Sequence, residues 1–182
     1  MEEITVRQEI FRALVRAGFA PITQTDTSVC ARCGYLNHPP IGRPDILVLN
    51  PTGPSFVVEC KICSTSLPKA HIRPEQRKWL NWWCREMGGM GFIALGVTGA
   101  RSGRKGYHLA LVPWPDWCTL EEKYGERESV PAAHRGTLNP DLAPYTLTWS
   151  TGQGWVLPQN ILGLRWKNDG HHSLRASEAV DY

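Results

Sequence analysis

The chain has 182 residues, of which 42% are hydrophobic, and one domain with a substantial core commonly has this length. It contains no run of about 18 apolar residues and its N-terminal segment is charged and amphipathic, so we expect neither a membrane-spanning helix nor a secretory signal, but a soluble, cytoplasmic protein. The formal charge of +3 permits a polyanionic partner without requiring one.

The first part of the chain predicts a helix followed by strands. Apolar residues recur at helical spacing over residues 2–17, and Gly18 is a natural stop. Residues 19–43 are irregular and predict a short strand and a loop. Two β-prone runs, residues 45–49 and 55–62, flank a cluster of turn residues and predict a hairpin. Both runs are apolar on both faces, which is typical of strands inside a covered sheet.

The middle of the chain predicts a second helix and two more strands. The helical pattern returns over residues 73–87, where Pro74 fits the first turn and two glycines follow the last. Residues 91–97 and 107–112 then predict strands. The resulting order is helix, strand, hairpin, helix, strand, strand.

The character of the chain changes after Pro113. Prolines, glycines and charges increase, and we identify no long periodic segment there. Residues 145–149 and 154–157 predict one more hairpin, and the last dozen residues are expected to be flexible. The predicted division is therefore a core over residues 1–113 and a C-terminal extension over residues 114–182.

The predicted hairpin brings two acidic residues together. If its turn is centred on Thr52, residues whose numbers sum to 104 face each other, and Asp45 is opposite Glu59. Directly opposed residues have Cβ atoms about 4.5–5.5 Å apart. Two carboxylates in apolar strands repel each other and resist desolvation, so they favour a bound cation. We expect Mg²⁺, held by Asp45, Glu59 and the backbone carbonyl of Cys60, with positions left for water and phosphate.

Strand alternation places Lys61 on the face of Glu59 and directs Cys60 to the other side. The Lys61 ammonium would then orient the attacking water and offset charge on the phosphate. A glutamate and a lysine two residues apart on a strand are usually a solvated pair. The longer combination, Gly42-Arg43-Pro44-Asp45, an apolar run, a turn and Glu59-Cys60-Lys61, is more specific and favours phosphodiester hydrolysis.

This combination resembles the PD-(D/E)xK nuclease superfamily, and especially its small phage and bacterial branches similar to Holliday junction resolvases and VRR nucleases. The match covers about residues 2–112. The resemblance implies an α/β, restriction-endonuclease-like core in which a mixed sheet of four to five strands is flanked by helices. It also implies that Asp45, Glu59 and Lys61 are the catalytic residues, that Gln76 is the glutamine of the following helix, and that a bacterial cell or a phage-infected host is the setting.

Members of this family often add an acid from the first helix to the metal site. Glu9 lies beside the apolar stripe of that helix and is our first choice as a catalytic residue and metal ligand. Glu3 is the alternative. A solvated charge on the helix surface is the alternative to a role at the site.

Other polar and aromatic residues have weaker patterns. Six basic residues are candidates for phosphate contacts, although each alone is more often simply solvated: Arg73, Arg77, Lys78, Arg101, Arg104 and Lys105. Three tryptophans at helical spacing, Trp79, Trp82 and Trp83, are expected mainly to pack against the sheet, with base stacking as the alternative. Two tryptophans after the last core strand, Trp114 and Trp117, are expected on a partner surface.

The six cysteines, without a signal peptide, indicate thiols or metal ligands and not disulfides. The pairs Cys30/Cys33 and Cys60/Cys63 have the spacing of a four-cysteine Zn²⁺ site. Strand geometry argues against that site, because Cys60 and Cys63 would point to opposite faces; a partial site with His38 is a variant. Two further cysteines, Cys84 and Cys118, are expected to be buried thiols.

The sequence thus favours a Mg²⁺-dependent DNA endonuclease, with Mn²⁺ as a substitute ion. Selectivity for branched DNA and a homodimer are expectations that rest on the resemblance alone. Two alternatives stay open: a nucleic-acid-binding module on the same fold with a weakened active site, and a zinc-stabilised interaction protein.

Overall fold

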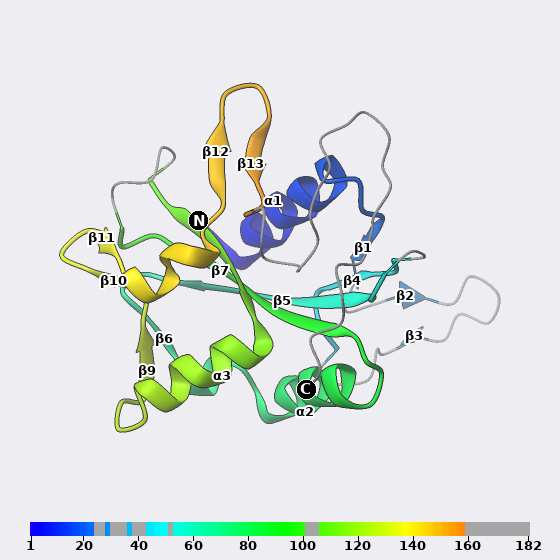
Figure 1. Cartoon of the computed structure of the whole chain (residues 1–182), viewed down its shortest axis with the longest axis horizontal. Coiled ribbons are helices and arrows are strands. Elements are labelled where there is room, and N and C mark those ends of the chain that lie inside the picture. Colours follow the sequence, from blue (N-terminus) through cyan, green and yellow to red (C-terminus); the bar gives the residue numbers. More distant parts are fainter. Residues whose placement is uncertain (24–27, 30–35, 38–42, 51–52, 101–105, 159–182) are drawn as a thin grey trace.

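A five-stranded mixed sheet forms the centre of the molecule (Figure 1). The computed structural model describes residues 1–23, 28–29, 36–37, 43–50, 53–100 and 106–158. The strands lie in the order β1 (Pro21–Thr23), β4 (Ile46–Val48), β5 (Phe56–Cys63), β7 (Met90–Val97) and β8 (His108–Pro113). Strands β5 and β7 are parallel and the other neighbours are antiparallel. This confirms the predicted α/β class and the mixed sheet of four to five strands.

Helices cover both faces of the sheet. Helix α1 (Glu3–Arg16) lies on one face, and α2 (Pro74–Arg85) and α3 (Trp114–Lys123) lie on the other (Figure 1). Strand β5 separates two hydrophobic cores because its side chains alternate. Val58 and Cys60 join the core beneath α1, whereas Val57 and Cys63 join the core beneath α2 and α3.

The register of the central hairpin is the predicted one. Ile46 pairs with Val58 and Val48 pairs with Phe56, so the paired numbers sum to 104. This ladder ends at Ile46, whereas β5 continues to pair with β7 as far as Cys63. In the described part of the chain, residues 59–63 therefore have a strand neighbour on one side only; we call the other side the open edge of β5.

The residues after Pro113 complete both cores. Helix α3 was not predicted, although Pro115 suits a first helical turn and Trp114, Trp117 and Leu120 recur at intervals that bring them onto the sheet. The expectation of a partner surface at the two tryptophans was wrong, because they are 3% and 0% exposed. The spacing of the apolar residues indicates helix α3, but the prolines and charged residues around them made this pattern hard to recognise.

Short elements surround the sheet. The expected C-terminal hairpin is present as β12 (Thr148–Ser150) and β13 (Gly154–Val156). Strand β13 lies next to α1 (Figure 1). The remaining elements are the strands β2 (Ser28–Val29), β3 (Leu36–Asn37), β6 (Ser66–Pro68), β9 (Ser129–Pro131), β10 (Ala133–His134) and β11 (Thr137–Leu138), and the 3-10 helices η1 (Lys69–His71) and η2 (Pro140–Tyr145). Within the described ranges, no helix combines the length and the apolar character needed to cross a membrane. The expected flexible tail lies outside the described residues.

Candidate active site

The open edge of β5 is where the acidic residues of the hairpin meet. Asp45 lies one residue before β4, opposite Glu59 in the continued register. Its Oδ2 accepts a hydrogen bond of 2.7 Å from the backbone amide of Cys60. The Asp45 carboxylate thus accepts the hydrogen bond that a β4 carbonyl would accept if the β4–β5 pairing continued. The site therefore lies where this pairing ends.

Glu59 is held by two donors. Lys61 Nζ lies 2.6 Å from its Oε1, and Gln76 Nε2 donates to the same oxygen. All three side chains are nearly enclosed, with exposures of 2% for Glu59, 7% for Lys61 and 4% for Gln76. The structure therefore brings together Asp45, Glu59, Lys61 and Gln76, four of the five residues chosen from the sequence.

Burial makes this a place where negative charge is costly. It raises the pKa of Glu59 to about 7, and the charge of Asp45 adds to the rise while Lys61 opposes it. Burial likewise raises the pKa of Asp45, against the lowering effects of the Cys60 amide and Lys61. A cation close to both carboxylates would relieve this cost.

On the first helix, Glu3 has a contact with the residues at the open edge. Glu3 Oε1 lies 3.9 Å from Lys61 Nζ, and its charge is among those that raise the pKa values of Asp45 and Glu59. Glu9 is 8% exposed and has a contact of 3.4 Å with Arg12 on its own helix. The geometry thus favours Glu3 as the helix acid, and a role for Glu9 stays a prediction.

Arg7 is a site residue that the sequence analysis missed. Its Nη1 lies 3.7 Å from Asp45 Oδ1, on the helix turn that follows Glu3. Residues four apart on a helix lie on the same side, so Glu3 and Arg7 face the open edge together. This spacing was visible in the sequence, but which side of α1 meets the open edge was not.

Gln76 is fixed at both ends of its amide. Its Oε1 accepts from the backbone amide of Arg73 at 2.9 Å, which caps the first turn of α2, and its Nε2 donates to Glu59. The two bonds require opposite ends of the amide and so set its orientation. Helix capping and the support of Glu59 thus depend on one side chain.

The donor set fits Mg²⁺. Among the described residues no cluster of three or more His, Cys, Asp or Glu side chains is arranged to hold a metal ion. Mg²⁺ does not need one, because it commonly uses one or two carboxylates and keeps several waters. Glu59 Oε1 is engaged by Lys61 and Gln76, and Asp45 Oδ2 by Cys60, so the candidate ligands of a cation are Glu59 Oε2 and, in competition with Arg7, Asp45 Oδ1. The carbonyl of Cys60 as a ligand stays a prediction.

The cysteines of the central strand do not form a zinc site. Cys60 and Cys63 belong to opposite cores, as strand alternation predicted. Burial raises the pKa of the Cys60 thiol well above its usual value and that of Cys63 to about 12. Cys30, Cys33 and His38 lie outside the described residues. Cys84 and Cys118, which were expected to be buried, are only half-buried.

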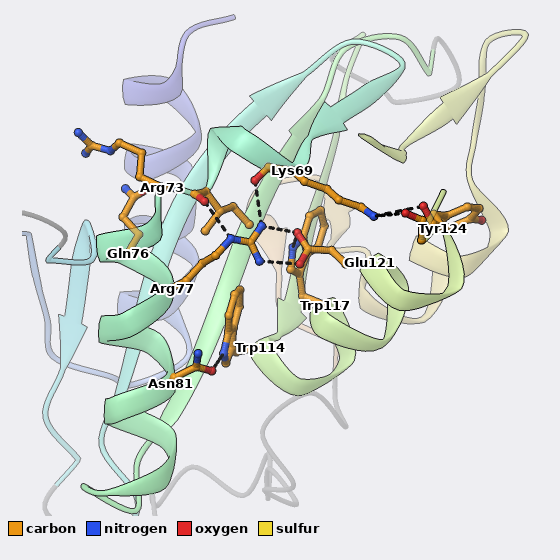
Figure 2. A network of polar contacts seen from close by, with 11 residues as sticks. Lys69, Arg73, Gln76, Arg77, Asn81, Trp114, Trp117, Glu121 and Tyr124 are labelled. Atoms are coloured by element: carbon orange, nitrogen blue, oxygen red, sulfur yellow. Dashed lines mark hydrogen bonds and ion pairs between the residues drawn. The ribbon is translucent and has the colours of Figure 1, made fainter. Parts of the chain in front are cut away.

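Arg77, one of the residues predicted to contact phosphate, instead joins α2 to α3 through hydrogen bonds (Figure 2). Arg77 makes two bonds of 2.6 Å to Glu121 of α3, and it also donates to the carbonyls of Ile72 and Lys69. Glu121 accepts a further bond from Trp117 Nε1. The prediction for Arg77 was therefore wrong, because its guanidinium is already engaged by the protein.

The remaining sequence candidates divide by exposure. Arg73 and Lys78 are exposed, and Arg101, Arg104 and Lys105 lie outside the described residues. Of the α2 tryptophans, Trp83 is buried, Trp79 is half-buried and stacks on Trp83, and Trp82 is 44% exposed. The expected core packing thus accounts for two of the three.

Comparisons with known proteins give similarity to solved structures only. No protein-family model matches the chain, and no curated protein matches it. Among solved structures, the fold is similar to that of Hjc from Archaeoglobus fulgidus, a Holliday junction resolvase from an archaeal hyperthermophile. The TM-score is 0.47 and the identity is 16%, with 87% of this chain and 97% of that chain covered. At this TM-score and identity the similarity carries no argument about activity. A proposal about activity must rest on the residues at the open edge of β5.

Proposed function

We propose that the chain is a Mg²⁺-dependent nuclease of the PD-(D/E)xK type that hydrolyses phosphodiester bonds in DNA. The observation that carries the proposal is the meeting of Asp45, Glu59 and Lys61, with Gln76 behind Glu59, where the β4–β5 ladder ends. A solvated charge pair would not be 2% and 7% exposed.

Each residue has a distinct task in this reaction. Asp45 and Glu59 would hold the ion, which supplies a Lewis acid that polarises the phosphoryl oxygens. Lys61 has three N–H donors, of which one reaches Glu59, so others are available to an attacking water or a phosphate oxygen. Gln76 keeps Glu59 in place. The water oxygen forms a bond to phosphorus as the bond to the leaving ester oxygen breaks. The attacking water loses a proton and the leaving oxygen takes one up, which gives a phosphate monoester and a free hydroxyl group.

Arg7 and Lys61 account for how the fold tolerates these carboxylates before an ion binds. Arg7 lies 3.7 Å from Asp45 Oδ1, and Lys61 lies 2.6 Å from Glu59. These two cations offset the repulsion between the acids. Mg²⁺ would then compete with Arg7 for Asp45, while Lys61 remains next to Glu59.

The test is cleavage of linear duplex, single-stranded, flap and four-way junction DNA, with RNA of matched sequence, in Mg²⁺, Mn²⁺ or a chelator. We expect Mg²⁺-dependent cleavage by the wild type and a loss of at least about 100-fold in Asp45→Asn and Lys61→Met, as when a transition-state contact is removed. A matched control is Lys123→Met, an exposed lysine on α3 that pairs with Asp141. Equal activity in all four proteins would refute the assignment, and binding without cleavage would identify the inactive module.

The substrate panel and the protein's mass in solution also test two finer parts of the proposal. We propose branched DNA as the preferred substrate and a homodimer as the active form, with the cytoplasm of a bacterium or a phage-infected cell as the setting. Preference for the junction would support the first, and a mass of two chains by light scattering would support the second.

A further inference from the structure

A pocket lies beyond the candidate active site, at the ends of β5 and β7. It has a volume of about 500 Å³ and is lined by Ser64, Thr65, Thr98, Gly99, Arg135 and Gly136. Its floor is the continuation of the two strands, where Gly99 N donates to Ser64 O and Thr98 N donates to Cys63 O, both at 3.0 Å. The pocket is thus built on the strand that carries Glu59 and Lys61.

The wall of the pocket is the turn of the β10–β11 hairpin. Ala132 and Ala133 donate their backbone amides to Thr65 O at 2.8 and 2.9 Å, which fixes the start of the hairpin to the end of β5. At its turn Arg135 has a φ of 49°, and it is the one non-glycine residue with positive φ in the described ranges. Such a conformation is unfavourable for a side chain, so the hairpin holds Arg135 in place at some cost.

The chemistry of the lining selects an anion. Arg135 supplies a guanidinium, and none of the lining residues is acidic. In the part of the chain that the structure describes, Arg135 has no carboxylate within ion-pair distance, unlike Arg77. Hydroxyl groups of Ser64 and Thr65, both exposed residues, add donors at the floor. Guanidinium and hydroxyl groups are typical ligands of nucleic-acid phosphates.

The distance along β5 relates the pocket to the reaction. Ser64 follows Lys61 by three residues, which is roughly 10 Å at the rise of a strand. Successive nucleotides of one strand of duplex DNA advance about 3.4 Å along the helix axis, and their phosphates lie farther apart than this because the strand winds around the axis, so the separation corresponds to a few nucleotides at most. A substrate strand with its scissile phosphate at Lys61 would therefore bring another phosphate to the pocket.

We propose that this pocket binds a backbone phosphate of the DNA substrate, within a few nucleotides of the scissile bond, with Arg135 as its principal ligand. This inference rests on the proposed function and adds a second contact that sets how far along the strand the substrate is held. Because the contact is to the backbone, it fixes position and carries no sequence preference.

The first experiment measures binding in an Asp45→Asn background, in which cleavage does not interfere. Affinity for duplex and junction DNA is measured over a range of salt concentrations for Arg135→Gln, Arg135→Lys and the control Arg127→Gln. Arg127 is also exposed but lies before β9, away from the pocket lining. Loss of one phosphate contact should weaken binding roughly tenfold and reduce the salt slope by about 1. Arg135→Lys should retain the slope, and Arg127→Gln should change neither.

The second experiment locates the phosphate. Neutral methylphosphonate linkages are placed singly at each position on both sides of the scissile bond. One position within a few nucleotides of the scissile bond should weaken binding by the parent protein but not weaken it further in Arg135→Gln. Two results would overturn the proposed phosphate site while leaving the nuclease proposal intact. One is that Arg135→Gln binds DNA with the affinity and salt slope of the parent, and the other is that Arg135→Gln and Arg127→Gln have equal effects. If the parent binds no DNA, the proposed function itself fails.

Discussion

Lys61 Nζ lies 2.6 Å from Glu59 Oε1, in a site where the glutamate is 2% exposed and the lysine 7% exposed. Such a pair is not a surface salt bridge, because neither charge has much contact with water. Its surroundings raise the pKa of Glu59 to about 7, so its protonation changes near neutral pH. Burial and the charges of Asp45 and Glu3 favour the neutral acid, whereas Lys61 favours the carboxylate.

Mg²⁺ should stabilise the protein more at high pH than at low pH. The folded-state pKa of Glu59 is raised from 4.5 to about 7, so its contribution to stability is fully present below about pH 4.5 and is lost as pH rises through about 7. Mg²⁺ needs the ionised carboxylate and should restore that stability. We expect a larger increase in Tm on adding Mg²⁺ at about pH 8 than at about pH 5.5. Glu59→Gln is the control, and equal increases at both pH values in the wild type would contradict the prediction.

Two substitutions of Asp45 should separate its structural role from its catalytic one. Asparagine keeps an oxygen for the Cys60 amide, whereas alanine leaves that amide without its acceptor. We expect both variants to lose cleavage, and Asp45→Ala to be less stable than Asp45→Asn by about 1–2 kcal/mol. Urea denaturation gives the free energy of unfolding, and the cleavage rate gives the function. Retained cleavage in Asp45→Asn would argue that its charge is not needed.

Much of the site was predictable because it depends on local geometry. The hairpin register followed from turn residues centred on Thr52, and it placed Asp45 opposite Glu59. Strand alternation placed Lys61 with Glu59 and Cys60 in the other core. These features can be predicted from the alternation of side chains along a strand and from the pairing register that a hairpin turn sets.

The features that were missed depend on how distant elements pack. The approach of Glu3 and Arg7 depends on where α1 crosses the open edge of β5, which no local pattern specifies. The pairing of Arg77 with Glu121 joins residues 44 positions apart. Before the partner is known, an arginine on a helix beside other basic residues looks like a phosphate ligand.

Glu3 and Glu9 should differ in their effect on the reaction. Glu3 lies 3.9 Å from Lys61, whereas Glu9 has its contact with Arg12. We expect Glu3→Gln to raise the Mg²⁺ concentration needed for half-maximal cleavage several-fold, because one negative charge near the ion is lost. Glu9→Gln is the matched control and should leave this requirement unchanged. The opposite order of effects would restore Glu9 as the helix acid.

Gln76 should affect the catalytic rate more than substrate binding. Replacement by alanine removes the donor to Glu59 and the acceptor for the Arg73 amide. We expect a fall in kcat of about tenfold or more with little change in KM, because Glu59 loses its fixed orientation. The substitution Gln76→Glu keeps the helix cap but places a second acid against Glu59, so it should be less active still at neutral pH. The exposed neighbour Glu75→Gln serves as control, and a change in KM alone would indicate a binding role.

Arg77 should matter for stability and not for DNA binding. Its guanidinium joins α2 to Glu121 of α3 and to two backbone carbonyls near η1, as Figure 2 shows. Arg77→Ala removes these charge-assisted bonds and, among the described residues, leaves Glu121 with its contact from Trp117, so we expect a loss of about 2–3 kcal/mol in the free energy of unfolding. The salt slope of DNA binding should stay the same, because no phosphate contact is lost. Lys78→Ala, on the same helix but exposed, should leave the stability unchanged. A reduced slope in Arg77→Ala at unchanged stability would instead return Arg77 to the DNA-binding surface.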